Sequence, residues 1–194
     1  MYKVFGITIF SSKTKKVIKL IFLQPLIIFI ITLISILILD LSLILTLTTK
    51  YKLWPPTNKI GFALKWILTP ITILGLLYLT LTSPFQKIYI LTLIPIILGL
   101  IIAIWSVKTL TLHDTVGIKG KLSKKGPYKY SRHPQYVGYI SMLIGLIIYT
   151  HTLQVLIISI LAILWYILAT YTEEPWLEKN YNYKAYKKQT PRFL

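Results

Sequence analysis

The chain contains no cysteine, and only 5 of its 194 residues are acidic. The absence of cysteine excludes disulfide bonds, thiol nucleophiles and cysteine-ligated metal centres. Its three histidines, His113, His133 and His151, are too far apart in sequence to form a short metal-binding motif. A P-loop or GxGxxG sequence for binding phosphates is also missing. We therefore predict no metal site and no nucleotide-binding loop of these common types.

Basic residues are abundant by comparison, because 22 lysines and arginines give the chain a formal net charge of +17. Such a surplus often accompanies nucleic-acid binding. Here the basic residues flank long apolar runs, which is typical of side chains that contact anionic lipid headgroups and set membrane topology. We therefore expect a lipid bilayer as the partner and no nucleic acid.

Hydrophobic residues make up 55% of the chain, and they gather in runs long enough to cross a bilayer as helices. Five apolar helices are expected, at Ile21–Thr48, Phe62–Thr82, Ile88–Val107, Tyr136–Tyr149 and Leu153–Tyr171. The first contains Pro25, and we interpret it as one tilted or kinked span. The prediction is an all-α, multi-pass membrane bundle of about five spans. We divide it into N-terminal transmembrane helices at 1–111 and a C-terminal half at 112–194 that forms the cofactor site.

Asp40 lies within the first apolar run. A charge inside the hydrocarbon is costly, so such a residue marks a functional site by default. The alternative is a position near the interface, paired with a lysine, and we favour this alternative because of the same cost.

Two polar clusters bracket the last two apolar helices. The first runs from Gly126 to Gly138, and the second begins at Glu173-Glu174. Only His151-Thr152 separates the two helices, which predicts a helix–turn–helix hairpin that brings both clusters to one face. Beyond it we expect a surface helix at Glu174–Gln189, with Trp176, Tyr183 and Tyr186 toward the membrane.

The first cluster combines features that suit a mixed polar and aromatic ligand. Its glycines allow close approach of the backbone, and its prolines stiffen the loop. His133-Pro134 precedes a helix whose free N–H groups favour an anion. With tyrosines and the two glutamates, the set matches a ligand that carries a purine, a ribose, a carboxylate and a sulfonium cation. Composition alone is equally consistent with an ordinary loop of interface anchors.

The C-terminal part, from about Leu112 to Leu194, resembles the superfamily of isoprenylcysteine carboxyl methyltransferases and phospholipid methyltransferases. The residues that carry the resemblance are Gly126-Pro127-Tyr128, Arg132-His133-Pro134-x-Tyr136-x-Gly138, Glu173-Glu174-x-x-Leu177, Tyr183-x-x-Tyr186 and Pro191-Arg192-Phe193. The resemblance implies a membrane enzyme that takes a methyl group from S-adenosylmethionine at the cytoplasmic face and passes it to a lipophilic acceptor.

The resemblance also assigns roles to residues. It implies that the cofactor is bound by His113, Gly120, Lys121, Leu122, Ser123, Tyr128, His133, Pro134, Gln135, Tyr136 and Glu174. We expect catalytic contributions from Arg132, Glu173 and Arg192. Glu173 or His133 would accept a proton from an amine acceptor, and the arginines would hold an acidic headgroup or carboxylate. A structural pair between Arg132 and one of the glutamates is the alternative for that arginine.

Our main prediction for the acceptor is the C-terminal carboxylate of a prenylated cysteine, and the alternative is the amine of a phospholipid. One departure bears on this choice: where the carboxyl methyltransferases carry an arginine one turn before the glutamate, this chain has Thr170. In either case the methyl group would move by direct in-line displacement. Alignment of the reactants would supply about 7–11 kcal/mol of the barrier lowering.

The distribution of basic residues gives conflicting indications of topology. Lysines and arginines in the loop before residue 134 and in the C-terminal tail place both in the cytoplasm. Three upstream spans would then put the lysine-rich N-terminus outside, against the same rule. Either Ile21–Thr48 crosses twice or the N-terminus is an exception.

Two other protein classes compete with a methyltransferase. Membrane sterol-type reductases that bind NADPH share the Arg-His-Pro-x-Tyr sequence, but the Glu173-Glu174 pair argues against them. A small transporter or assembly factor would place polar residues inside several spans, and this chain has few.

Overall fold

The structure is a computed structural model. It describes the backbone of residues 2–4, 7–9, 12–50, 52–54, 58–84, 90–110 and 122–194, and the side chains of these ranges from residue 23 onward, apart from residue 90. Its helices are α1 (Ser12–Thr48), α2 (Lys59–Leu81), α3 (Ile90–Thr109), the 3-10 helix η1 (Gly126–Lys129), α5 (Pro134–Thr150), α6 (Leu153–Asn180) and α7 (Tyr183–Gln189). Two short antiparallel strands, β1 (Tyr2–Val4) and β2 (Ile7–Ile9), precede them.

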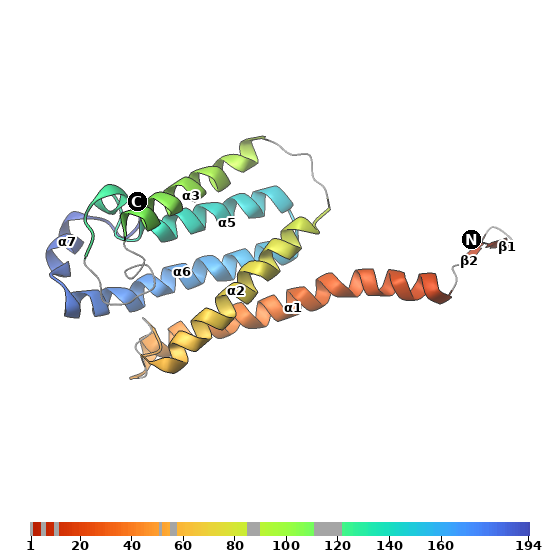
Figure 1. Cartoon of the computed structure of the whole chain (residues 1–194), viewed down its shortest axis with the longest axis horizontal. Coiled ribbons are helices and arrows are strands. Elements are labelled where there is room, and N and C mark those ends of the chain that lie inside the picture. The colour runs from red at the N-terminus through yellow and green to blue at the C-terminus, as the bar shows by residue number, and fades with distance from the viewer. Residues whose placement is uncertain are drawn as a thin grey trace.

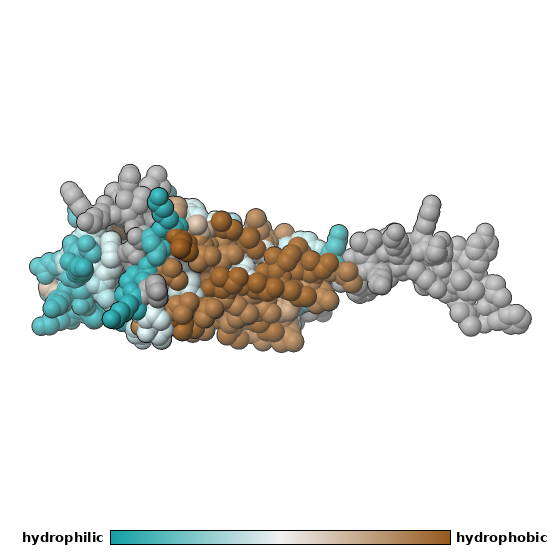
Figure 2. Space-filling model, turned by 90° about the horizontal axis from the view of Figure 1, so that it is seen from below, coloured by the Kyte–Doolittle hydropathy of each residue, from teal (hydrophilic) through white to brown (hydrophobic). Residues whose placement is uncertain are grey.

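The helices confirm the predicted membrane bundle. Four are long and apolar enough to span a bilayer, within α1, α2, α3 and α6, and α5 is a shorter apolar helix of 17 residues. Leucine and isoleucine side chains on the outside of α1, α2 and α3 are exposed, as lipid-facing residues are. Figure 2 shows a broad apolar band on the face seen from below, next to a polar end where α7 lies in Figure 1.

The bundle consists of two packed groups of helices. α1 packs against α2 and α6, whereas α3 packs against α5, and α5 joins the groups by packing on α6 (Figure 1). The predicted α5–α6 hairpin is present, and its turn contains His151 in a left-handed conformation with φ 51°. α2 packs on α1 and α6 rather than on α3 or α5, which leaves room between α2 and α5.

α1 is one continuous helix despite Pro25, so the first apolar run crosses once. The start of α1 and the C-terminal segments therefore lie at opposite ends of the bundle (Figure 1). The lysine-rich start of α1 is thus an exception to the charge rule if the C-terminal end is cytoplasmic.

α3 and α5 approach each other closely through glycine. A Cβ atom on Gly138 would lie 2.6 Å from the carbonyl oxygen of Gly99 and 2.8 Å from the backbone nitrogen of Ala103. Only a residue without a side chain allows this spacing, as in other tightly packed membrane helices. This contact fixes the first half of α5, where the predicted cofactor residues lie.

The predicted surface helix at Glu174–Gln189 is wrong in its bounds and orientation. α6 continues through Glu173, Glu174 and Pro175 to Asn180, because one missing ladder hydrogen bond at a proline is tolerated in such a helix. Tyr183 and Tyr186 in α7 are buried in the protein, at 1% and 3% exposure, rather than turned toward the membrane.

Asp40 is buried at 4% exposure, and neither carboxylate oxygen has a hydrogen-bond partner among the described residues. No described lysine pairs with it, so the favoured interpretation of an interface pair is wrong for this part of the chain. Its burial inside α1 agrees instead with the alternative of an intramembrane acid at a functional position.

We predict that Gly138→Val destabilises the bundle. Overpacking a tight helix contact costs about 1–3 kcal/mol, which should lower the midpoint of thermal unfolding in detergent by about 5 °C. Ile144→Val, on the same helix but 43% exposed, serves as the control and should leave the midpoint unchanged. Equal midpoints for both variants would contradict the proposed role of Gly138.

Candidate functional site

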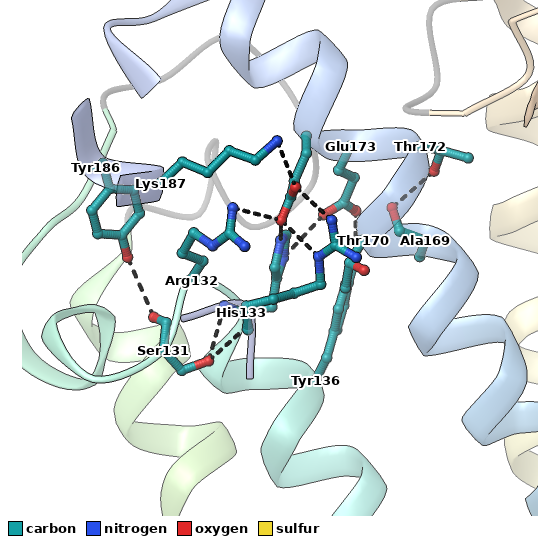
Figure 3. A network of polar contacts seen from close by, with 12 residues as sticks. Ser131, Arg132, His133, Tyr136, Ala169, Thr170, Thr172, Glu173, Tyr186 and Lys187 are labelled. Atoms are coloured by element: carbon teal, nitrogen blue, oxygen red, sulfur yellow. Dashed lines mark hydrogen bonds and ion pairs between the residues drawn. The ribbon is translucent and has the colours of Figure 1, made fainter. Parts of the chain in front are cut away.

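The carboxylate of Glu174 is buried and is surrounded by basic groups that include Arg132, His133 and Lys187. Figure 3 shows these three residues within the network of polar contacts. Arg192 binds the Glu174 carboxylate with two hydrogen bonds, from Nε to Oε1 at 2.9 Å and from Nη2 to Oε2 at 2.7 Å. Arg132 Nη1 lies 3.0 Å from Oε1. Two-pronged arginine–carboxylate pairs are among the strongest hydrogen-bonded contacts in proteins. In this protein, the hydrogen bonds to Glu174 are the main reason that the pKa of Arg192 lies above its ordinary value.

Two further basic groups complete the surroundings of Glu174. His133 Nε2 lies 3.6 Å from Oε1, and Lys187 Nζ lies 3.5 Å from Oε2. Lys187 is closer to Glu178, at 2.8 Å. A buried charge is destabilising unless it is well paired, so this carboxylate requires the basic groups around it. We call Glu174, Arg132, His133, Lys187 and Arg192 the Glu174 cluster.

Backbone contacts join the same segments of the chain. The N–H of Arg132 donates to the carbonyl of Pro191 at 2.9 Å, and Ser131 Oγ donates to the carbonyl of Arg192 at 3.1 Å. The hydroxyl of Tyr186 donates to the carbonyl of Tyr128 at 2.5 Å. Burial raises the pKa of Tyr186 to about 12, which keeps this donor protonated. The C-terminal tail is therefore an integral part of the site.

Glu173 has a different environment from that of its neighbour. Its Oε1 accepts hydrogen bonds from Trp54 Nε1 at 3.1 Å and from the Tyr136 hydroxyl at 2.5 Å. Its Oε2 lies 3.7 Å from His133 Nδ1, and the His133 ring stacks on the ring of Tyr136. Its side chain is partly exposed and faces a cavity.

This cavity has a volume of about 810 Å³, which is within the range of small-molecule sites. Its polar end contains Glu173, Arg132, His133 and several tyrosines. From there it extends between α2 and α5 as an apolar arm, lined by residues that include Ile73, Leu77, Met142 and Leu146. One continuous cavity thus joins a charged end to an apolar arm.

Some donors at the polar end have no hydrogen-bond partner among the described residues. They are Nε of Arg132 and the hydroxyl of Tyr183, whereas Arg132 Nη1 and His133 Nε2 are directed at Glu174, at 3.0 and 3.6 Å from its Oε1. Arg132, His133 and Tyr183 line the cavity. Buried polar groups are nearly always paired, so free donors on a cavity wall indicate a site for an acceptor-rich ligand.

The predicted site residues fall into three groups. Those on the cavity wall are Leu122, Ser123, Tyr128, Arg132, His133, Gln135, Tyr136 and Glu173. Glu174 and Arg192 lie behind the wall in the Glu174 cluster, and Pro134 is the first residue of α5. His113, Gly120 and Lys121 lie outside the described residues.

Some cavity residues were not predicted from the sequence. Trp54 and Lys65 come from the N-terminal half, which was expected only to span the membrane. A charged residue inside an expected span is a usable signal for Lys65, although a lysine near a span end is usually explained by snorkelling of its ammonium to the interface. Nothing in the sequence around Trp54 indicates that its loop reaches α6.

Thr170 occupies the position where a carboxyl methyltransferase would carry an arginine. It is fully buried, and its hydroxyl donates to the carbonyl of Ile167 at 2.8 Å. This side chain is therefore not placed to hold a carboxylate in the cavity.

The sequence is similar to known methyltransferases. A family model described as phospholipid methyltransferase matches residues 88–184. Over 99 residues the chain is 31% identical to phosphatidylethanolamine N-methyltransferase B of Dictyostelium discoideum. The match covers 47% of this chain and 50% of that protein, so the chain spans about half the length of the curated relative. No solved structure matches the chain.

We predict strong energetic coupling between Arg192 and Glu174. Arg192→Met leaves a buried carboxylate poorly paired and should lower the free energy of unfolding by about 3 kcal/mol. Glu174→Gln in that background should recover part of the loss, so the double variant is more stable than the two single effects summed. Denaturation in mixed micelles measures the four states of the cycle.

Lys187→Met is the control for that cycle. Its side chain is 42% exposed, and surface ion pairs contribute about 0–1 kcal/mol. Two results would contradict the central position of the Arg192–Glu174 pair. One is that Arg192→Met and Glu174→Gln change the free energy of unfolding additively. The other is that Lys187→Met lowers this free energy as much as Arg192→Met does.

Proposed function

The chain belongs to the phospholipid methyltransferase family, and from this premise we propose that it methylates the amine of a phospholipid headgroup, using S-adenosylmethionine. The observation that carries the proposal is one continuous cavity, which places an acid and hydrogen-bond donors at one end of a groove suited to lipid chains. The basic residues around the polar end support a position on the cytoplasmic side.

The polar end suits S-adenosylmethionine, because the donors without partners match its acceptor groups. Arg132 Nε would bind its carboxylate, and the Tyr183 hydroxyl would bind a hydroxyl or amine. Tyr128, Leu122 and Ser123 would contact the remaining parts. When bound, the cofactor supplies a methyl group on a sulfonium, which is ready for displacement. His113, Gly120 and Lys121 stay predicted contacts from the sequence.

Glu174 would act indirectly in this scheme. It was expected to bind the cofactor itself, but its oxygens face the arginines and His133 rather than the cavity. We therefore assign it the positioning of Arg132 and His133. Arg192, expected to be catalytic, would share this role, since its Nε and Nη2 are both bonded to Glu174.

Glu173 would act directly on the acceptor. It is the acid on the cavity wall, held in place by Trp54 and Tyr136. A carboxylate here attracts the ammonium form of a headgroup amine and then accepts its proton, which frees the nitrogen lone pair for attack. The chain's contribution is thus to align the amine and remove its proton.

The negative charge of Glu173 disfavours the acceptor that we mainly predict from the sequence, which is the carboxylate of a prenylated cysteine. A second carboxylate beside Glu173 would be repelled, and Thr170 offers no compensating positive charge. The family and the curated relative, named as an N-methyltransferase, also favour the alternative of a phospholipid amine.

We expect the full chain, in vesicles that contain phosphatidylethanolamine, to transfer labelled methyl groups from S-adenosylmethionine to the lipid amine. Mass spectrometry of the extracted lipid would identify the product. Glu173→Gln should lower kcat by about 10²–10⁴, because it removes the proton acceptor, and should leave S-adenosylhomocysteine binding nearly unchanged. Glu178→Gln, the same change five residues along α6, is the matched control.

The competing acceptor is tested in the same assay with farnesylated N-acetylcysteine. Base-labile label on this compound, with none in the lipid, would contradict the proposal. So would the absence of label in both acceptors under conditions in which S-adenosylhomocysteine binds.

A further inference from the structure

We propose that Lys65 binds the phosphate of the lipid headgroup and thereby selects phospholipids among amine-bearing lipids. This inference rests on the proposed function and specifies its acceptor site. It begins with an unusual placement: Lys65 lies six residues into the apolar helix α2, and it lines the cavity.

The side chain of Lys65 turns inward rather than toward the membrane surface. Its Nζ lies 3.8 Å from the centre of a ring of Trp54, which is itself buried. A lysine that snorkels would extend its ammonium toward lipid headgroups outside the protein. Contact with an aromatic face instead holds the ammonium at the cavity wall.

Trp54 connects Lys65 to the proposed proton acceptor. The ring that contacts Lys65 belongs to the side chain whose Nε1 donates to Glu173 Oε1. A cation and an anion therefore flank one indole on the same wall. A headgroup whose amine reaches Glu173 can therefore place its next functional group near Lys65.

Lys65 has the charge that a phosphate requires. The positive charges of Arg132 and Arg192 are directed at Glu174. Lys65 makes no ion pair within 4 Å in the part of the chain that the structure describes. A lysine ammonium binds phosphate as a point charge, without the fixed geometry that a two-pronged arginine pair demands.

The order of groups along the cavity matches the order of groups in a phospholipid. Glu173 and Trp54 lie at the polar end, Lys65 follows, and the cavity-lining residues farther along α2 are Thr69, Ile73 and Leu77. A phospholipid presents an amine, then a phosphate two carbons away, then acyl chains. The amine at Glu173, the phosphate at Lys65 and the chains along the apolar arm can be satisfied together.

The test compares two acceptors in the same vesicles: phosphatidylethanolamine, and a dioleoyl aminolipid that has the primary amine but no phosphate. Lys65→Met should raise KM for phosphatidylethanolamine by about 10- to 100-fold, the range expected for a lost hydrogen bond to a charged group. Its KM for the phosphate-free lipid should equal that of the unmodified chain. Lys65→Arg, which keeps the charge, should retain most of the affinity for phosphatidylethanolamine.

An equal increase in KM for both acceptors would overturn the inference, because it would mean that Lys65 acts on the amine, on Glu173 or on the fold. Unchanged KM for phosphatidylethanolamine in Lys65→Met would overturn it as well. S-adenosylhomocysteine binding by Lys65→Met reports whether the variant is folded. If the unmodified chain methylates neither lipid, the proposed function fails first, and this outcome differs from a failure confined to Lys65.

Discussion

A buried carboxylate at the polar end requires positive charge around it, and the arrangement of that end follows from this requirement. Glu174 is carried by the last turns of α6, whereas its partners come from the loop before α5 and from the tail. An unpaired carboxylate in this position would be strongly destabilising, so the segments that carry its partners are held together. Loop and tail then close one end of the cavity.

The two adjacent glutamates have separate roles because neighbouring residues on a helix point about 100° apart. One side chain turns into the protein, where it pairs with arginines, and the other turns into the cavity, where Trp54 and Tyr136 hold it. Glu174 supports the side chains that are proposed to bind the cofactor. Glu173 supplies the negative charge that is proposed to bind the acceptor amine. The proposed reaction therefore takes place in the cavity between Glu173 and the residues that Glu174 supports.

Much of this arrangement could be predicted from the sequence. Long apolar runs predicted the spans because each must satisfy its own backbone in lipid. The two-residue connection at His151-Thr152 predicted that Glu173-Glu174 would return to Arg132-His133, and the ion pairs between these segments confirm it. The end of α6 could not be placed, because the apolar run ends at Tyr171 whereas the helix continues through Pro175 to Asn180.

Other features depend on packing that local patterns do not encode. Trp54 reaches Glu173 only because α1 packs along α6 and presents the following loop to it. Lys65 resembles any lysine near the end of a span until the Trp54 ring beside it is known. Tyr183 and Tyr186 had the spacing of membrane anchors, yet the carbonyl of Tyr128 and the charge of Arg132 give them partners inside the protein.

The loop before α5 and the C-terminal tail are proposed to form one cofactor site around Glu174. Hydrogen exchange of the full chain in detergent, with and without S-adenosylhomocysteine, tests this proposal most directly. The account predicts that this compound slows exchange in both 126–136 and 186–193, that NADPH does not, and that Glu174→Gln weakens both effects together. Protection of only one segment, or protection by NADPH instead, would contradict a single methyl-donor site at this end of the bundle.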